Sequence, residues 1–212
     1  MKNRFEGVRL HIVSIVVTLD QRASRRTPDR VSAMARRLNV SLDAHLLLHF
    51  VRTAGDEMQG VVATGEGLAS VARQCLETGG WWIGIGVGPI DEPSGKTARE
   101  TRGQAFWHAR EAVERARKHK GGSPGPIAVI GEPVEVAEQL EAALSAVAFI
   151  VKRRTARQRA AVDLARTTSG LQPVASALGV SVSAVSQLLR TAGLEEQTRL
   201  ERLVASLAES VA

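Results

Sequence analysis

Residues 10–19 spell LHIVSIVVTL, a nearly continuous run of apolar and mostly β-branched side chains. Such a run is typical of a strand that is covered on both faces, because neighbouring side chains of a strand point to opposite sides of the sheet. The run lacks the small-residue cleavage site of a signal peptide, and no segment has the roughly twenty apolar residues of a membrane span. We therefore expect a cytoplasmic protein that does not enter a membrane and is built on a covered sheet.

The segments that follow alternate between helical and strand patterns. Thr27 and Pro28 are suited to start a helix, and apolar residues then recur at helical spacing until Asn39. The other predicted elements are a hairpin of residues 45–52 and 58–63, helices over 68–76, 97–120 and 134–151, and strands over 81–90 and 126–130. This order predicts an α+β or α/β sandwich with helices packed on a sheet.

The strand predicted at 81–90 has one face without side chains. Gly84, Gly86 and Gly88 alternate with bulky aliphatic residues, so all three glycines point to the same side of the sheet. Glycines in a strand interior mark a close approach of another part of the chain or of a ligand. We predict that something large lies directly against this face.

A second strong pattern lies at 171–190. If Leu171 is the first position of a twenty-residue helix-turn-helix, Ala175 lies where the two helices cross, Gly179 lies in the turn, and Ser181 can cap the second helix. All the positions that such a unit buries are then apolar: Val174, Leu178, Val180, Val185 and Leu188. The segment LQPVASALGVSVSAVSQLLRTAGL resembles helix-turn-helix regulators of the winged and sigma-region type.

The second helix of this unit would present Ser181, Ser183, Ser186, Gln187 and Arg190 to solvent. The last two can reach base edges in a major groove, whereas the first two serines suit phosphate. The C-terminal domain, which we place at residues 152–212, carries nine basic and five acidic side chains. We predict that it binds double-stranded DNA. The alternative is a small three-helix module that contacts protein.

The helix predicted at 195–211 carries an apolar stripe, formed by Leu200, Leu203, Val204, Leu207 and Val211. Specific DNA affinity is usually reached by two copies on a two-fold-related operator. We therefore predict a homodimer, with this stripe as a candidate interface. The alternative is that the stripe folds back on the helix near residues 159–164.

Two acidic residues of the N-terminal domain, residues 1–151, lie at predicted strand ends. Asp20 follows the first strand and Asp56 lies at the hairpin tip, so both meet at one sheet edge if these strands are neighbours. Paired carboxylates favour Mg²⁺ or Mn²⁺, and Arg22, Arg25 and Arg26 suit the phosphates of a nucleotide. The alternative is that the two aspartates only cap turns.

The sequence TAGDEMQG on the hairpin and the small-residue strand IGIGVG resemble the palm-type nucleotide cyclase superfamily, including class III cyclases and GGDEF proteins. With TLDQRASRR and RGQAFWHAREAVERAR, the chain resembles more specifically the SatD family. The resemblance implies a ferredoxin-like palm domain followed by an all-α helix-turn-helix domain, an α+β chain overall. It also implies that Asp20 and Asp56 correspond to metal-binding acids, with Glu57 beside the second.

Two departures from the cyclase pattern affect the expected function. Gln21, Arg22 and Ala23 stand where a cyclase has an apolar residue and an aromatic one, and Trp107 stands where a transition-state Asn is expected. These departures argue against turnover more than against nucleotide binding. We expect a DNA-binding transcriptional regulator whose N-terminal domain senses a nucleotide or mediates dimerisation. The alternatives are a metal-dependent cyclase or nucleotidyl transferase that carries a DNA-binding module, and an interaction protein without a ligand.

Overall fold

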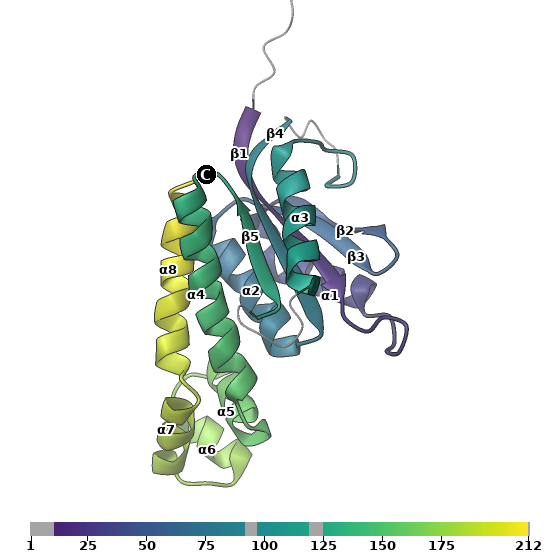
Figure 1. The fold of residues 1–212 in the computed structure, drawn as a ribbon. Coiled ribbons are helices and arrows are strands. Elements are labelled where there is room, and N and C mark those ends of the chain that lie inside the picture. The colour runs from purple at the N-terminus through teal and green to yellow at the C-terminus, as the bar shows by residue number, and fades with distance from the viewer. Residues whose placement is uncertain (1–10, 92–96, 119–124, 212) are drawn as a thin grey trace, which may run out of the picture.

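The computed structural model describes residues 11–91, 97–118 and 125–211, and its central element is the strand β1, His11–Gln21. The sheet has the order β2-β3-β1-β4-β5 (Figure 1), with β2 at Leu46–Ala54, β3 at Glu57–Val62, β4 at Trp81–Asp91 and β5 at Ile127–Gly131. β1 is antiparallel to both neighbours, β2 and β3 form the predicted hairpin, and β5 runs parallel to β4. The strands β1–β4 and the two helices between them, α1 at Val31–Leu42 and α2 at Gly65–Thr78, thus have the order and directions of a split βαβ unit.

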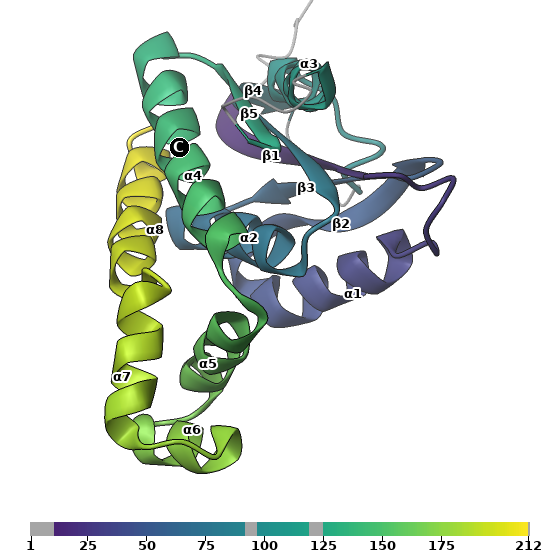
Figure 2. The same cartoon turned by 60° about the horizontal axis from the view of Figure 1, so that its bottom comes forward.

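Helices cover both faces of the sheet, as the buried first strand predicts. α1, Val31–Leu42, and α2, Gly65–Thr78, lie on one face, and α3, Gln104–Lys118, lies on the other (Figure 2). α4, Val134–Arg153, packs beside β5 on the side of α2. The main core lies between the sheet and α1, α2 and α4, so the protein is a mixed α+β protein with a mixed sheet. None of the described helices is long and apolar enough to cross a membrane.

The bare face of β4 is explained by α3. A Cβ atom on Gly84 would lie 2.3 Å from the carbonyl oxygen of Ala109, and one on Gly86 would lie 2.0 Å from the carbonyl oxygen of Ala105. The backbone of α3 therefore contacts the backbone of β4 directly, which only glycine permits. This confirms the prediction of a close approach.

α1 begins later than predicted, because a side chain of β1 holds the preceding segment. Gln21 donates through its amide to the Thr27 hydroxyl at 3.0 Å and to the Pro28 carbonyl at 2.7 Å, and it accepts from the Arg30 N–H at 2.8 Å. The helix then starts at Val31 rather than at Thr27 and Pro28. It also continues past Asn39 to Leu42, since the Asn39 side chain bonds the backbone of β2 instead of ending the helix.

α3 also begins later than predicted, at Gln104 instead of residue 97. The segment before it forms a turn in which the Thr97 N–H and hydroxyl donate to Glu100, and the Thr101 hydroxyl donates to the Thr97 carbonyl. Gly103 then pairs with Ile90 at the end of β4. The predicted end of this helix at residue 120 lies outside the described residues.

Four helices follow α4: α5 at Ala156–Thr167, α6 at Leu171–Leu178, α7 at Val182–Thr191 and α8 at Leu194–Glu209. The chain passes from α4 to α5 through a short break in the helix. α4 ends at Arg153, and after two residues α5 starts in a capping box between Thr155 and Gln158. α5, α6 and α7 share a small core around Val174, Ala175 and Val185.

The apolar stripe of α8 packs inside the molecule, so it is not the free dimer surface that we predicted. Val204, Ala208 and Val211 are buried in the core beneath the sheet, and Leu207 packs against that core. α8 lies alongside α4 and also contacts α2 (Figure 1). Of the stripe, Leu203 is clearly exposed, at 48%. The alternative prediction, that the stripe folds back on the helix near residues 159–164, is also wrong, because α8 packs against α2 and α4.

Candidate functional site

A polar cleft opens at one end of the sheet, where the segment after β1, the tip of the β2–β3 hairpin, the start of β4 and the last turn of α3 meet. Its volume is about 930 Å³, and it is lined by Asp20, Gln21, Arg22, Ala23, Ser24, Arg25, Arg26, Asp29, Arg52, Gly55, Asp56, Trp82 and Arg117. The two aspartates and three arginines singled out in the sequence therefore line one cleft. Pairing of β1 with β3 brings them together, and the Gln21 N–H donates to the Asp56 carbonyl at 3.0 Å.

Asp20 is the buried acid of the cleft, with 5% of its surface exposed. It lies opposite Glu57 across the β1–β3 pair, and its Oδ2 lies 3.3 Å from Nη1 of Arg117. Burial raises the pKa of Asp20 to about 6 against the lowering effect of Arg117, and the negative charges of Asp56 and Glu57 add smaller increases. A carboxyl group with so perturbed a pKa in a cleft is a common mark of a functional site.

The arginines of the cleft are held in two ways. The Arg22 guanidinium lies over the Trp82 ring, 4.1 Å from its centroid, and the Arg22 N–H donates to the Gly80 carbonyl at 2.9 Å. Arg25 and Arg26 lie in the turn that follows and are exposed. Their side chains are therefore available to an anion that enters from solvent.

Sequence reasoning missed two further arginines and the tryptophan. Arg52, on the hairpin, donates to Asp29 at 2.5 Å and to the Gly55 carbonyl at 2.6 Å. Arg117 reaches the cleft from the last turn of α3, which no local pattern could indicate. Only a weak indication of Trp82 was present in the sequence. Trp81 and Trp82 are neighbours in a strand, so their side chains point to opposite faces of the sheet, and Trp81 is the one that is buried in the main core.

The cleft is richer in cations than in metal-binding groups. Within the described ranges, no group of three or more His, Cys, Asp or Glu residues is arranged to hold a metal ion. Asp20 is already paired with Arg117, and Glu57 accepts from the Thr53 hydroxyl at 2.6 Å and pairs with Arg110 at 3.4 Å. The arrangement can attract an anion more readily than it can ligate a bare divalent cation.

The second predicted site lies on α7, at the far end of α4. Gly179 adopts a positive φ of 64° between α6 and α7, and the Ser181 side chain accepts from the Ala184 N–H at 3.2 Å as the cap of α7. The other predicted residues of this face, Ser183, Ser186, Gln187 and Arg190, are all exposed, and Arg190 donates to Gln187. Sequence reasoning missed Val182, a 39% exposed apolar residue in the first turn of α7.

A buried charged network joins these helices to the rest of the molecule. Arg154, between α4 and α5, is 4% exposed. Its Nε donates to the Ala192 carbonyl at 2.9 Å, its Nη2 donates to Gln197 at 2.5 Å, and its Nη1 lies 3.8 Å from Glu77 at the end of α2. Burial lowers the pKa of Arg154, and the charge of Glu77 opposes that effect.

Two carboxylates complete the network. Glu77 lies 3.2 Å from Arg166 of α5 and 3.5 Å from Arg73 of its own helix, while Glu201 of α8 accepts from Gln197 at 2.6 Å and lies 3.4 Å from Arg166. The network thus links α2, α5 and α8 at one point. Sequence reasoning did not identify it, because its members are far apart in the chain.

The fold and the cleft together define an α+β protein with a covered five-stranded sheet and a cationic cleft at one end of that sheet. Its helical unit, α5–α8, is joined to α2 by buried charges. The SatD family model matches residues 11–207 of the chain. The chain therefore belongs to the SatD family, as its sequence resemblance implied. None of the curated proteins compared with the chain matches it.

Proposed function

We propose that the protein is a DNA-binding transcriptional regulator in which residues 152–212 act as a helix-turn-helix domain. The observation that carries the proposal is the arrangement of α6, a left-handed Gly179 and α7, with a short polar face on α7 turned to solvent. A helix of this kind fits a major groove, where its solvent-facing side chains contact base edges. Gln187 and Arg190 are the residues for bases, and Val182 is suited to a thymine methyl group.

The surroundings of α7 support DNA rather than protein as the partner. Arg157 and Arg159 are exposed on α5, which packs against α7. Phosphate contacts supply most of the affinity of such proteins and orient them on the duplex, so exposed cations beside a recognition helix are expected. A protein-binding module would instead expose a contiguous apolar patch on α7, and apart from Val182 its outer face is polar.

Substitutions on α7 test the proposal. A duplex enriched by the wild-type chain from a random pool should lose about 5- to 100-fold in affinity with Gln187→Ala or Arg190→Ala, because each good base contact contributes roughly 1–3 kcal/mol. Arg199→Ala is the matched control, since it removes an exposed cation of α8 that pairs with Glu195. Titration at several salt concentrations measures the effect. Equal losses for Arg199→Ala and Arg190→Ala would indicate bulk charge instead of recognition by α7.

We further propose that the cleft binds the phosphates of a nucleotide, with Mg²⁺ or Mn²⁺ where the nucleotide brings it, and that the sheet is a degenerate ferredoxin-like palm domain without turnover. Exposed Arg25 and Arg26 and stacked Arg22 support an anion, and Asp20 and Asp56 support a metal only as part of a metal–nucleotide complex. A metal-dependent cyclase or transferase is less well supported, because the Asp20 carboxylate, which would have to bind the metal, already forms an ion pair with Arg117.

The end of α2 connects the cleft with the helical unit. Gly80 accepts from the Arg22 N–H at the cleft, Arg30 reaches the carbonyl of Gly79 at 3.3 Å, and Glu77, on the preceding turn, binds Arg154 and Arg166. A ligand that moves Arg22 would therefore act on the segment that positions α5 and α8. This path supports a regulator whose DNA affinity depends on the cleft.

Thermal unfolding tests the ligand. Nucleoside triphosphates with Mg²⁺ should raise the melting temperature of the wild-type chain, because a ligand that binds only the folded state stabilises it. The variant Arg25→Ala with Arg26→Ala should lose that rise, whereas Arg36→Ala, an exposed arginine of α1 outside the cleft, should keep it. A rise that persists in the double variant would place the nucleotide elsewhere, and no rise with any nucleotide would remove this part of the proposal.

A further inference from the structure

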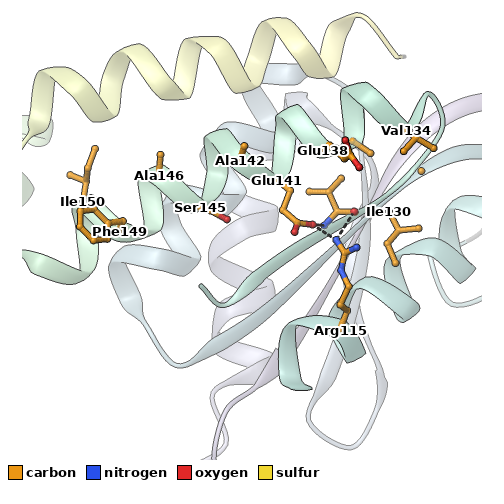
Figure 3. A pocket seen from close by; sticks show the side chains of 13 residues that line it. Arg115, Ile130, Val134, Glu138, Glu141, Ala142, Ser145, Ala146, Phe149 and Ile150 are labelled. Carbon is orange, nitrogen blue, oxygen red and sulfur yellow. Dashed lines mark hydrogen bonds and ion pairs between the residues drawn. The ribbon is translucent and has the colours of Figure 1, made fainter. Parts of the chain in front are cut away.

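A groove runs along α4, between that helix and the elements β5 and α3 (Figure 3). Its volume is about 930 Å³, and it is lined by Arg115, Val129, Ile130, Gly131, Val134, Ala137, Glu138, Glu141, Ala142, Ser145, Ala146, Phe149 and Ile150. Its floor is fixed by Glu141, whose carboxylate accepts from Arg115 of α3 and from the Val129 N–H of β5 at 2.7 Å. The groove is thus a built feature of three elements.

The groove presents apolar side chains to solvent at both of its ends. Val134, near its start, is 56% exposed, and Phe149, near its end, is 62% exposed. Between them lie the small residues Ala142, Ser145 and Ala146 beside Glu138 and Glu141, and the Ser145 hydroxyl is buried without a hydrogen-bond partner among the described residues. Large exposed hydrophobic residues that flank a groove are typical of a surface that another chain covers.

The distribution of charges along α4 indicates that the chain that covers the groove is a second copy of this protein. The exposed side chains of its first turns include Glu135 and Glu138, whereas those of its last turn are Lys152 and Arg153. A second α4 laid antiparallel to the first would place the acidic turns of each copy opposite the basic turn of the other. The same face is therefore complementary to itself under a two-fold axis, as an isologous dimer interface requires.

We propose that a second copy of this chain covers the groove, with the two α4 helices antiparallel and Phe149 of each copy inserted between Ile130 and Val134 of the other. This dimer does not use the α8 stripe, which belongs to the core. It does not depend on the proposed DNA binding. The central small residues let the helices approach, and the terminal charges set their direction.

Sedimentation equilibrium tests the interface. The wild-type chain at about 50 µM should have roughly twice the chain mass of 22.7 kDa. Phe149→Glu should weaken association by about 30-fold or more, because a buried aromatic anchor is replaced by a charge. Leu203→Glu, at the exposed residue of α8, is the control and should remain dimeric. A monomeric wild type, or a Phe149→Glu chain that dimerises like the wild type, would overturn the proposal.

Charge reversal tests the antiparallel direction. Glu135→Lys with Glu138→Lys makes both ends of α4 basic, and Lys152→Glu with Arg153→Glu makes both ends acidic, so each double variant should be monomeric. An equimolar mixture of the two should form a one-to-one heterodimer, since acidic ends then face basic ends in both halves of the interface. Circular dichroism confirms that each variant is folded. Double variants that dimerise as tightly as the wild type, or a mixture that stays monomeric, would overturn the arrangement.

Discussion

Replacing Glu77 by Gln should lower the free energy of unfolding by about 3–5 kcal/mol, because it leaves a buried arginine without its nearest carboxylate. Arg154 has only 2% of its side chain exposed, and the pair Arg154–Glu77 lies inside the junction of α2, α5 and α8. Arg166 loses its closer partner in the same change. Urea denaturation followed by circular dichroism measures the loss.

Glu66→Gln is the matched control for this change. Glu66 lies in the first turn of the same helix and is exposed, so its charge contributes at most a few tenths of a kcal/mol through the helix dipole. A loss below about 1 kcal/mol for Glu77→Gln, similar to that of the control, would show that the network does not hold the helical unit to the sheet.

Replacing Asp20 by Asn should stabilise the protein at pH 7 and not at pH 4. The folded-state pKa of Asp20 is raised from 3.8 to about 6, so folding favours its protonated form and opposes its ionised form. The resulting cost develops as the pH rises from about 4 to about 6 and is fully present at pH 7. Two pKa units correspond to about 3 kcal/mol, and this net shift already includes the attraction of Arg117, so we expect a gain of roughly 2–3 kcal/mol.

Asp29→Asn is a control of opposite sign. The hydrogen bond from Arg52 lowers the pKa of Asp29, so its ionised form stabilises the fold above its ordinary pKa, and that contribution is lost as the pH falls. The substitution should therefore weaken the fold at pH 7. Unfolding curves for both variants at pH 4 and pH 7 measure the two effects. An equal increase in the stability of Asp20→Asn at both pH values would contradict a raised pKa. An increase confined to pH 7 would show that the ionised Asp20 side chain destabilises the fold.

The strands and the close β4–α3 contact could be predicted because their signals are local. Residues 10–19 form a nearly continuous apolar run, and the alternation of Gly84, Gly86 and Gly88 requires only the two-residue period of a strand. The turn at Gly179 and the Ser181 cap follow from local backbone preferences in the same way. The predicted start of α1 was wrong, because Gln21 of β1 binds the residues that would have formed the first turn of the helix.

Five of the thirteen residues that line the cleft could be predicted as site residues: Asp20, Arg22, Arg25, Arg26 and Asp56. Asp20 lies near the end of β1, and Asp56 directly precedes β3. Because β1 pairs with β3 in an antiparallel arrangement, the two aspartates lie at the same edge of the sheet. Arg117 could not be predicted, because its position depends on where the last turn of α3 crosses the sheet. The role of α8 was missed for a similar reason: an apolar stripe shows that a helix face is covered, but not by which partner.

Sequence-specific DNA binding by the intact chain tests the central proposal most directly. The affinity for a duplex enriched from a random pool should exceed the affinity for a scrambled duplex of the same composition by about a thousandfold or more at roughly 150 mM salt. The affinity for both duplexes should fall as salt is raised, because phosphate contacts release counterions. Equal affinities for the two duplexes, or no binding to either, would contradict a regulator that recognises DNA through α7.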